Sequence, residues 1–294
     1  MPDVAVFTDL ALLVTLWATG IGVGVILPRG AGRWREDGTW MLLGIVLNVV
    51  AIPVIASVLC RLLGVPLDAS AGVLLVASAA GGLLGLTTTR LAGGDMRRAL
   101  VLVLVLEVAN IAAIPFWSGL LLSTATAAPV LPIIRTVVLL LLVPLAIGLT
   151  LRRVRPTLAP GIARACGAIS SVGLAIVVGL VVVDATPTIG TTLGTGVPLV
   201  AFVMIAGGMA VGAWLGGTGT GGRRAMAMVT GGHSSALALA LSRTAFADRP
   251  QVEAAVVVSG LIGVVIPVGA AVAVRAWGRR TGNLRTDIVA DPGA

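Results

Sequence analysis

The chain has 294 residues, of which 57% are hydrophobic and only 11% are charged, and its mean hydropathy is +1.09. A soluble domain carries roughly 25% charged residues, so this composition excludes a soluble protein and predicts an all-α polytopic membrane protein. All twenty basic residues are arginine. Because they flank apolar runs, we interpret the net charge of +8 as charged loop ends rather than a nucleic-acid-binding surface.

Nine apolar runs are long enough to cross the roughly 30 Å hydrocarbon core, which takes about 20 helical residues. In chain order they cover 7–27, 40–63, 69–91, 99–122, 131–151, 162–183, 197–216, 224–245 and 252–274. The loops between them are short. We therefore predict nine transmembrane helices in a single membrane transporter domain over 1–274, and a disordered polar tail over 275–294.

The arginines also predict the orientation. Sixteen of the twenty lie in or beside the loops that follow the first, third, fifth and seventh runs, or in the tail. Positively charged loops remain in the cytoplasm. We expect an integral plasma-membrane protein with its N-terminus outside and its C-terminus in the cytoplasm.

Two of the nine runs are interrupted by glycines. Run 69–91 is interrupted at Ala79-Ala80-Gly81-Gly82, and run 224–245 at Thr230-Gly231-Gly232, just before the only histidine, His233. Glycine is a poor helix former, and unwound backbone at membrane depth is tolerated only where protein or a water-filled cavity satisfies it. Such interruptions in corresponding halves indicate the binding site of a secondary transporter.

The two interrupted runs cross the membrane in opposite directions. This predicts an inverted-topology repeat, with a first repeat over 7–122, an unpaired helix over 131–151 and a second repeat over 162–274. Hydroxyls after the breaks often bond to a carbonyl one turn earlier, so alone they are weak indicators of binding. We nevertheless take the following as candidate substrate-binding residues: Gly81, Gly82, Thr87, Thr230, Gly231, Gly232, His233 and Ser234.

Three polar side chains inside the runs are candidates for ion coupling. Glu107 either exchanges a proton or cation, or is a protonated acid bonded to Asn110 one turn on. Asn48 either ligates an ion or bonds to a neighbouring helix. His233 either exchanges protons or satisfies a backbone carbonyl. One histidine and two separate cysteines do not suggest a metal site, and no cofactor is expected.

Longer stretches resemble the bile acid:sodium symporter family. They are GIVLNVVAIPVIASVLCRLLGVPLDASAGVLLVASAAGGLLGLTTTRLAGGD in the first half and TGGHSSALALALSRTAF in the second. The resemblance covers about 40–117 and 223–277, with weaker agreement between. It implies a core domain around two crossing broken helices, a panel domain of the first, fifth and sixth helices, and alternating access by movement of one domain against the other.

The chain departs from this family where the resemblance implies sodium ligands. Apolar residues or glycine stand at the positions that would carry hydroxyl, amide or carboxylate oxygens, namely Gly85, Leu86, Ala99, Val103, Met228 and Gly232. Ala80 replaces the family's proline before the first break, and His233 stands at the family's second amide beside the second break. The family's amide in the second helix persists as the shorter Asn48. Sodium is a hard cation that needs oxygen ligands, as Ca²⁺ and Mg²⁺ do. We expect the fold to be retained and the sodium sites to be lost.

These observations predict a secondary active transporter of a small organic anion, a carboxylate or a sulfonate, held by the positive N-terminal ends of the half-helices. Its expected partners are the lipid bilayer, the anion and protons, with sodium less favoured and nucleic acid excluded. Two alternatives stay open: a proton-coupled transporter or antiporter of an inorganic or cationic solute that uses Glu107, and an uncoupled facilitator. A receptor without flux also stays open. An enzyme is not expected, because His233 and Ser234 are adjacent rather than on facing helices.

Overall fold

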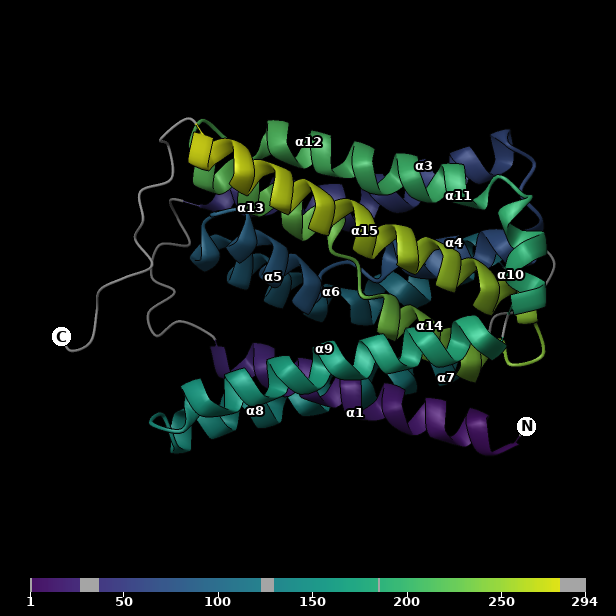
Figure 1. Cartoon of the computed structure of the whole chain (residues 1–294), viewed down its shortest axis with the longest axis horizontal. Helices are drawn as coiled ribbons and strands as arrows, with labels where there is room; N and C mark the ends of the chain where they lie inside the picture. Colours follow the sequence, from purple (N-terminus) through teal and green to yellow (C-terminus); the bar gives the residue numbers. More distant parts are fainter. Residues whose placement is uncertain (1, 27–36, 123–129, 185, 281–294) are drawn as a thin grey trace.

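The computed structural model describes residues 2–26, 37–122, 130–184 and 186–280, and every regular element in these ranges is helical (Figure 1). Seven helices are long and apolar enough to span a membrane, or eight spans if the bent pair α4–α5 counts as one. The all-helical, membrane-spanning architecture is therefore confirmed. The pair α13–α14 does not meet the same criteria, so this count over the described residues falls short of the nine predicted spans.

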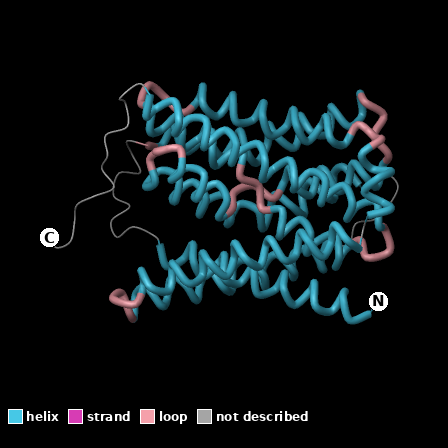
Figure 2. Tube along the Cα trace, in the orientation of Figure 1, coloured by secondary structure: helices cyan, strands magenta, loops and turns pink. Residues whose placement is uncertain are grey.

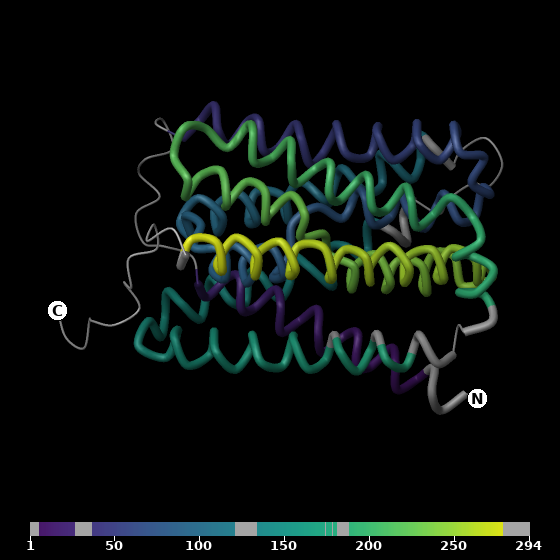
Figure 3. Tube along the Cα trace, turned by 45° about the horizontal axis from the view of Figure 1, so that its top comes forward, coloured from purple at the N-terminus to yellow at the C-terminus, as the bar shows by residue number. Residues whose placement is uncertain are grey.

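Three long segments form a separate layer along one side of the bundle (Figures 1 and 3). They are α1 (Pro2–Ile26), the continuous segment α7 (Val130–Val137), η2 (Val138–Leu142) and α8 (Val143–Val154), and α9 (Ala159–Asp184). Helix α1 packs along both α8 and α9, and a hydrogen bond of 3.0 Å from Thr19 Oγ1 to Ser170 Oγ joins α1 to α9. We call these segments the panel layer. We call the end of the bundle at which α1 starts the N-terminal end.

The other helices form a core layer. They are α2 (Gly38–Ile45), η1 (Val46–Ala51), α3 (Ile52–Leu62), α4 (Leu67–Ser78), α5 (Leu83–Leu91), α6 (Met96–Leu122), α10 (Thr186–Leu193), α11 (Val197–Phe202), η3 (Val203–Gly207), α12 (Gly208–Leu215), α13 (Thr220–Gly231), α14 (Ser235–Ala245) and α15 (Pro250–Arg280). The η segments are wider π-helical turns within longer helices. Two of them, η1 and η2, directly precede a helix whose second residue is a proline, Pro53 or Pro144, which has no N–H to donate.

Two core helices are broken, and both breaks lie in the middle of the bundle (Figure 2). The first break, residues 79–82, separates α4 from α5, which are bent by 60°; it lies where the glycines predicted it. The second break was predicted at Thr230–Gly232, but α13 continues through Gly231 and the chain is irregular only at 232–234. The reason is packing. A Cβ at Gly231 would lie 2.7 Å from the Met209 side chain and 3.1 Å from the ring of Pro267, so this glycine permits close helix packing rather than unwinding.

Two further predictions need correction. Helix α15 continues to Arg280, so residues 275–280 are helical and not part of a disordered tail; residues 281–294 lie outside the described residues. Arginine and alanine, which occur in this segment, have a high intrinsic helix propensity. Within the predicted loop before residue 197, Thr186–Leu193 forms α10, with Pro187 in its first turn, where the missing N–H costs no hydrogen bond.

Candidate functional site

The two breaks contact each other through backbone atoms. The N–H of Ser234 donates to the carbonyl of Ala79 at 2.8 Å. A Cβ atom added to Gly232 would lie 2.4 Å from the backbone N of Gly85, in the first turn of α5. Real Cβ atoms essentially never come this close, so glycine is required at 232 for the two chains to cross as they do.

The second break is built from two tight turns. The N–H of His233 donates to the carbonyl of Gly231 at 3.2 Å, and the N–H of Ser235 donates to the carbonyl of His233 at 3.0 Å. With φ of −90° at Gly232 and −82° at Ser234, both turns are inverse γ-turns, which need no positive φ. The backbone conformation of the turn therefore suits any residue. Glycine is needed at 232 because the two chains approach each other closely there.

The first break is different, because its glycines hold conformations that other residues avoid. Gly82 has φ of +148° and ψ of 165°, a region essentially restricted to glycine. The amide Nδ2 of Asn110 on α6 donates to the carbonyl of Ala80 at 2.8 Å, and the N–H of Gly85 donates to the carbonyl of Gly82 at 3.1 Å. Together with the bond from Ser234 to Ala79, these donors satisfy carbonyls that unwinding has removed from the helix ladder.

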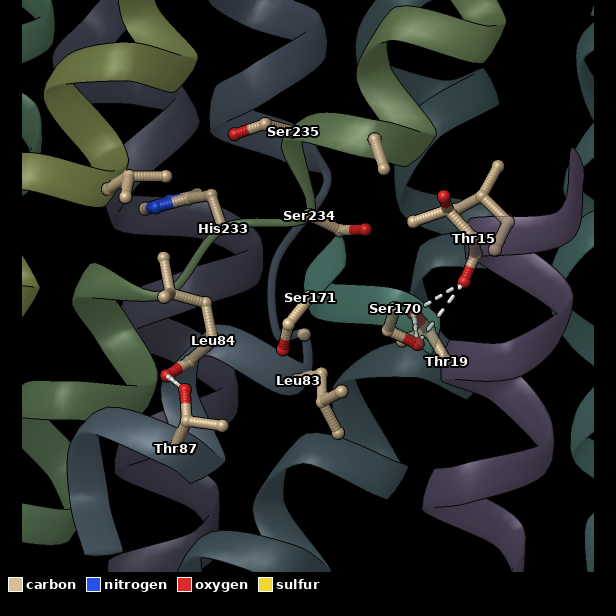
Figure 4. Close-up of a pocket in the computed structure, with 14 residues that line it drawn as sticks. Thr15, Thr19, Leu83, Leu84, Thr87, Ser170, Ser171, His233, Ser234 and Ser235 are labelled. Atoms are coloured by element: carbon tan, nitrogen blue, oxygen red, sulfur yellow. Dashed lines mark hydrogen bonds between the residues drawn. The ribbon is translucent and has the colours of Figure 1, made fainter. Parts of the chain in front are cut away.

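A cavity of about 100 Å³ lies between the two breaks and the panel layer (Figure 4). It is lined by the N-terminal residues of both half-helices, Gly82 to Leu84 of α5 and Ser234 to Ala236 of α14. Helix N-termini carry unpaired N–H groups and a partial positive charge of about half a unit. Among the described residues, seven with side-chain hydroxyls line it and no arginine does; the seven are Thr15, Thr19, Thr87, Ser170, Ser171, Ser234 and Ser235.

The panel-layer wall of this cavity is a small hydroxyl network. Thr19 Oγ1 lies 3.0 Å from Ser170 Oγ, and Ser170 Oγ donates to the carbonyl of Thr15 at 3.5 Å. Thr15 Oγ1 donates to the carbonyl of Ala11 at 2.7 Å. These bonds orient the hydroxyls of α1 and α9 at the level of the breaks.

The core wall presents Ser234 and His233 in opposite directions. In Figure 4 the Ser234 side chain points toward Thr15 and Ser170, whereas the His233 imidazole points away from them. His233 is buried, and neither Nδ1 nor Nε2 has a hydrogen-bond partner among the described residues. The Thr87 hydroxyl donates to the carbonyl of Leu84 at 2.9 Å, the local bond expected after the break.

Glu107 lies beside this cavity rather than in it. A smaller cavity of about 10 Å³ between α6 and the panel layer is lined by Glu107, and it shares Leu16, Thr19 and Ser234 with the larger one. Glu107 is 5% exposed, and its Oε2 atom has no hydrogen-bond partner among the described residues. The carboxyl thus faces the boundary between the layers, next to the second break.

The remaining predicted residues lie elsewhere. Asn48 donates to Thr230 Oγ1 at 3.2 Å and to the Gly44 carbonyl at 2.8 Å, so the pair joins η1 to the end of α13. Asn48, Thr230, Gly81, Gly231 and Gly232 do not line the cavity. Gly82, Thr87, His233 and Ser234 do line it.

The positions at which sodium ligands were expected to be lost are buried and apolar. Ala99 and Val103 are fully buried, and Leu86 and Met228 are 3% exposed. A Cβ on Gly81 would lie 3.2 Å from Leu106 Cβ, so the first break faces hydrocarbon on this side. The side chains of Ala99, Val103, Leu86 and Met228 offer sodium no oxygen ligand.

Sequence reasoning missed the panel-layer half of the cavity. Thr15 and Thr19 are one helical turn apart in the first run, and Ser170 and Ser171 are adjacent in the sixth. Paired hydroxyls within otherwise apolar runs were the available signal. It is weak, because such hydroxyls usually bond to their own helix, as Thr15 and Ser171 do.

Comparison with known proteins identifies the family of this chain. Among curated proteins none matches the chain significantly. The family model described as the Sodium Bile acid symporter family matches residues 10–192, more than half of the 294 residues, and includes the first break, Asn48 and Glu107. An all-helical membrane protein with a broken helix inside this match is what the resemblance implied, and the chain belongs to the sodium bile acid symporter family of membrane transporters.

Proposed function

We propose that this protein is a secondary active transporter of a small organic anion, a carboxylate or a sulfonate, which binds in the cavity between the breaks and the panel layer. The observation that carries the proposal is that this cavity rests on the N-termini of two half-helices at once. Each terminus favours an anion. The hydroxyls of the cavity can donate to its oxygens when they turn away from the helix carbonyls to which they now donate, as those of Thr15, Thr87 and Ser171 do. A cationic solute would meet the positive ends of both helices.

The volume favours a small binding moiety. A cavity of 150 Å³ in another protein admits benzene, a molecule of six carbons. A cavity of about 100 Å³ therefore suits a group of about four heavy atoms, the size of a carboxylate or sulfonate with its neighbouring carbon.

Proton coupling through Glu107 follows from its place beside the cavity. An anion bound near Ser234 and Thr19 would repel a carboxylate at Glu107, so binding of the anion favours binding of a proton there. By linkage, the proton favours the anion equally. The buried apolar side chains at the lost ligand positions argue against sodium as the coupling ion.

Alternating access would move the panel layer against the core. At the N-terminal end, Arg243 of α14 pairs with Asp9 of α1 at 2.7 Å and with Glu253 of α15 at 2.7 Å. This arginine ties the two layers together there. The main packing partners of α5 and α13, toward the other end, are core helices. In this proposal the protein is closed at the N-terminal end, which we expect from the arginine distribution to lie outside the cell.

Nine spans in an inverted repeat are part of the same proposal. The predicted second and seventh helices each contain a π-helical turn, η1 and η3. The third and eighth are the broken ones. The fourth and ninth each contain an internal proline, Pro115 and Pro267. These paired irregularities support a match between 7–122 and 162–274.

Uptake into proteoliposomes tests the proposal. We expect short carboxylates or sulfonates to accumulate in response to an inward proton gradient, with no change when choline replaces Na⁺, and Glu107→Gln to remove most of the pH response. A steep Na⁺ dependence would refute proton coupling. Transport by Glu107→Gln that equals wild type at every pH would favour the uncoupled facilitator, in which Glu107 is structural.

A further inference from the structure

A separate cavity of about 160 Å³ lies where α3 ends and α4 begins, toward the N-terminal end of the bundle (Figure 1). It shares no lining residue with the hydroxyl-lined cavity between the breaks and the panel layer, so the proposed function does not use it. Its polar lining residues are Ser57, Cys60, Arg61 and Ser70, and its apolar ones are Val65, Leu67 and Leu74. A cavity that has a cation and two hydroxyls on its walls suits an anion.

The turn that joins α3 to α4 beside this cavity is a Schellman motif. Gly64 has φ of +63°, its N–H donates to the carbonyl of Arg61 at 3.3 Å, and the N–H of Val65 donates to the carbonyl of Cys60 at 2.9 Å. The hydroxyl of Ser70 donates to the carbonyl of Val65 at 3.2 Å and ties the start of α4 to the turn. The walls of the cavity are therefore fixed by hydrogen bonds.

Arg61 has no protein partner for its charge. Three arginines of the core layer lie in or beside segments predicted to face outside, and two of them, Arg243 and Arg249, form ion pairs with carboxylates. Arg61 lies in the last turn of α3, and its side chain makes neither an ion pair nor a hydrogen bond with a described residue. The nearest acidic residue along the chain, Asp68, does not line the cavity and pairs with Arg249 at 3.4 Å. The N–H donors of Arg61 thus remain for a ligand.

The cavity lies at the level where the hydrocarbon of the membrane ends. The membrane-spanning stretch 38–62 ends one residue after Arg61, so the guanidinium reaches the headgroup region. Leu62 is 75% exposed, and Leu67, which lines the cavity, is 44% exposed. Exposed apolar side chains on membrane helices face lipid. A group bound to Arg61 can therefore carry hydrocarbon chains along these leucines.

We propose that this cavity binds a phosphate group, to whose oxygens the Arg61 guanidinium donates two parallel hydrogen bonds. The hydroxyls of Ser57 and Ser70 now donate to helix carbonyls and add donors when they turn toward the phosphate. The volume fits, because a cavity of 150 Å³ admits the six carbons of benzene. A phospholipid headgroup and a free phosphate ion share this chemistry, and the exposed leucines favour the phospholipid.

Lipid binding to the purified, delipidated protein, measured by native mass spectrometry, tests the proposal. Phosphatidylglycerol is compared with diacylglycerol of the same chains, which lacks the phosphate, and inorganic phosphate is titrated by calorimetry. We expect phosphatidylglycerol to bind about tenfold more tightly than diacylglycerol. Arg61→Gln should lower the affinity for phosphatidylglycerol about 10- to 100-fold at an unchanged Tm, because hydrogen bonds to a charged group are lost from an exposed side chain. Arg61→Lys keeps the charge without the planar fork and should lie between them.

Two variants separate this cavity from an arginine that merely touches the membrane surface. Ser70→Leu fills the cavity while Arg61 remains, so its affinity should fall as in Arg61→Gln. Arg135→Gln is the matched control, because Arg135 is an exposed arginine of α7 that does not line the cavity, and its loss changes the net charge equally. It should bind phosphatidylglycerol as wild type does.

The two sources of phosphate give different results. A preference for phosphatidylglycerol that depends on Arg61 assigns the site to a lipid headgroup. Binding of inorganic phosphate that Arg61→Gln abolishes, without a preference between the two lipids, assigns it to a soluble phosphate. Equal affinities in Arg61→Gln and Arg135→Gln, wild-type affinity in Ser70→Leu, or failure of both phosphate sources to bind would overturn the inference.

Discussion

Replacing Gly232 by alanine tests the contact on which the candidate site depends. The added Cβ would lie 2.4 Å from the N and 2.5 Å from the Cα of Gly85, whereas ordinary contact begins at 3.4 Å. Both are backbone atoms, so no side-chain rotation relieves the overlap. The second break and α5 must therefore separate by about 1 Å, the difference between these distances.

The cost of this separation follows from the effect of overpacking. An added methyl group that forces backbone shifts costs about 1–3 kcal/mol. Gly232 has φ of −90° and ψ of 68°, which alanine also adopts, so backbone strain adds little. If the anion binds only when the two breaks are in contact, this cost lowers the affinity for the anion about 5- to 150-fold.

Thermal unfolding in detergent and anion binding measure the two effects. Gly207→Ala is the matched control, because a Cβ at Gly207 in η3 meets no atom within 4 Å. It should leave binding unchanged and raise stability by about 0.5–1 kcal/mol, since alanine is favoured over glycine within a helix. If Gly232→Ala has the same Tm and the same anion affinity as Gly207→Ala, the two breaks do not touch as described.

Three further outcomes are expected. Asn110→Leu, which removes the donor to the Ala80 carbonyl at the first break, should lower the free energy of unfolding by about 1–3 kcal/mol; an unchanged Tm would show that another donor serves this carbonyl. Asp9→Asn weakens the ion pair between α1 and α14. A cysteine introduced into the hydroxyl-lined cavity should therefore react faster with a thiol reagent added at the N-terminal end. Asp68→Asn, whose ion pair lies within the core, should not have this effect, and equal rates in both variants would exclude a gating role. A cysteine introduced in place of Arg153 should react with a membrane-impermeant thiol reagent only from the cytoplasm, and one in place of Asp248 only from outside. The opposite pattern would reverse the proposed orientation.

The helical segments and the first break could be predicted because their causes are local. About twenty apolar residues between short polar loops are sufficient to locate a helix. Gly81 and Gly82 have φ of +80° and +148°, so two adjacent glycines there do mark the conformation that requires them. The 275–280 segment was misjudged because its polarity indicated a loop end, while its arginines and alanine continue the helix.

The second break and the panel side of the site depend on tertiary contacts. Gly231 and Gly232 are adjacent glycines, and only their surroundings distinguish them: a Cβ at Gly231 would meet Met209 and Pro267, whereas one at Gly232 would meet the backbone of Gly85. The sequence suggests only Glu107 as a partner for Asn110, because the bond from Asn110 to Ala80 at the first break depends on where α6 lies. The layers meet through residues far apart in sequence, so no local pattern marks Thr19 and Ser170 as neighbours.

The bond from Ser234 to Ala79 has a consequence for how the protein is made. Ala79 is synthesised 155 residues before its hydrogen-bond donor. At about 5–20 residues per second, roughly 8–30 s pass before residue 234 exists. During that time the unwound backbone of the first half has no partner from the second half, and a bare carbonyl in hydrocarbon costs several kcal/mol. The first break must therefore be satisfied by water or by the insertion machinery until residue 234 is made, and this interval is the stage at which the protein is most exposed to quality control.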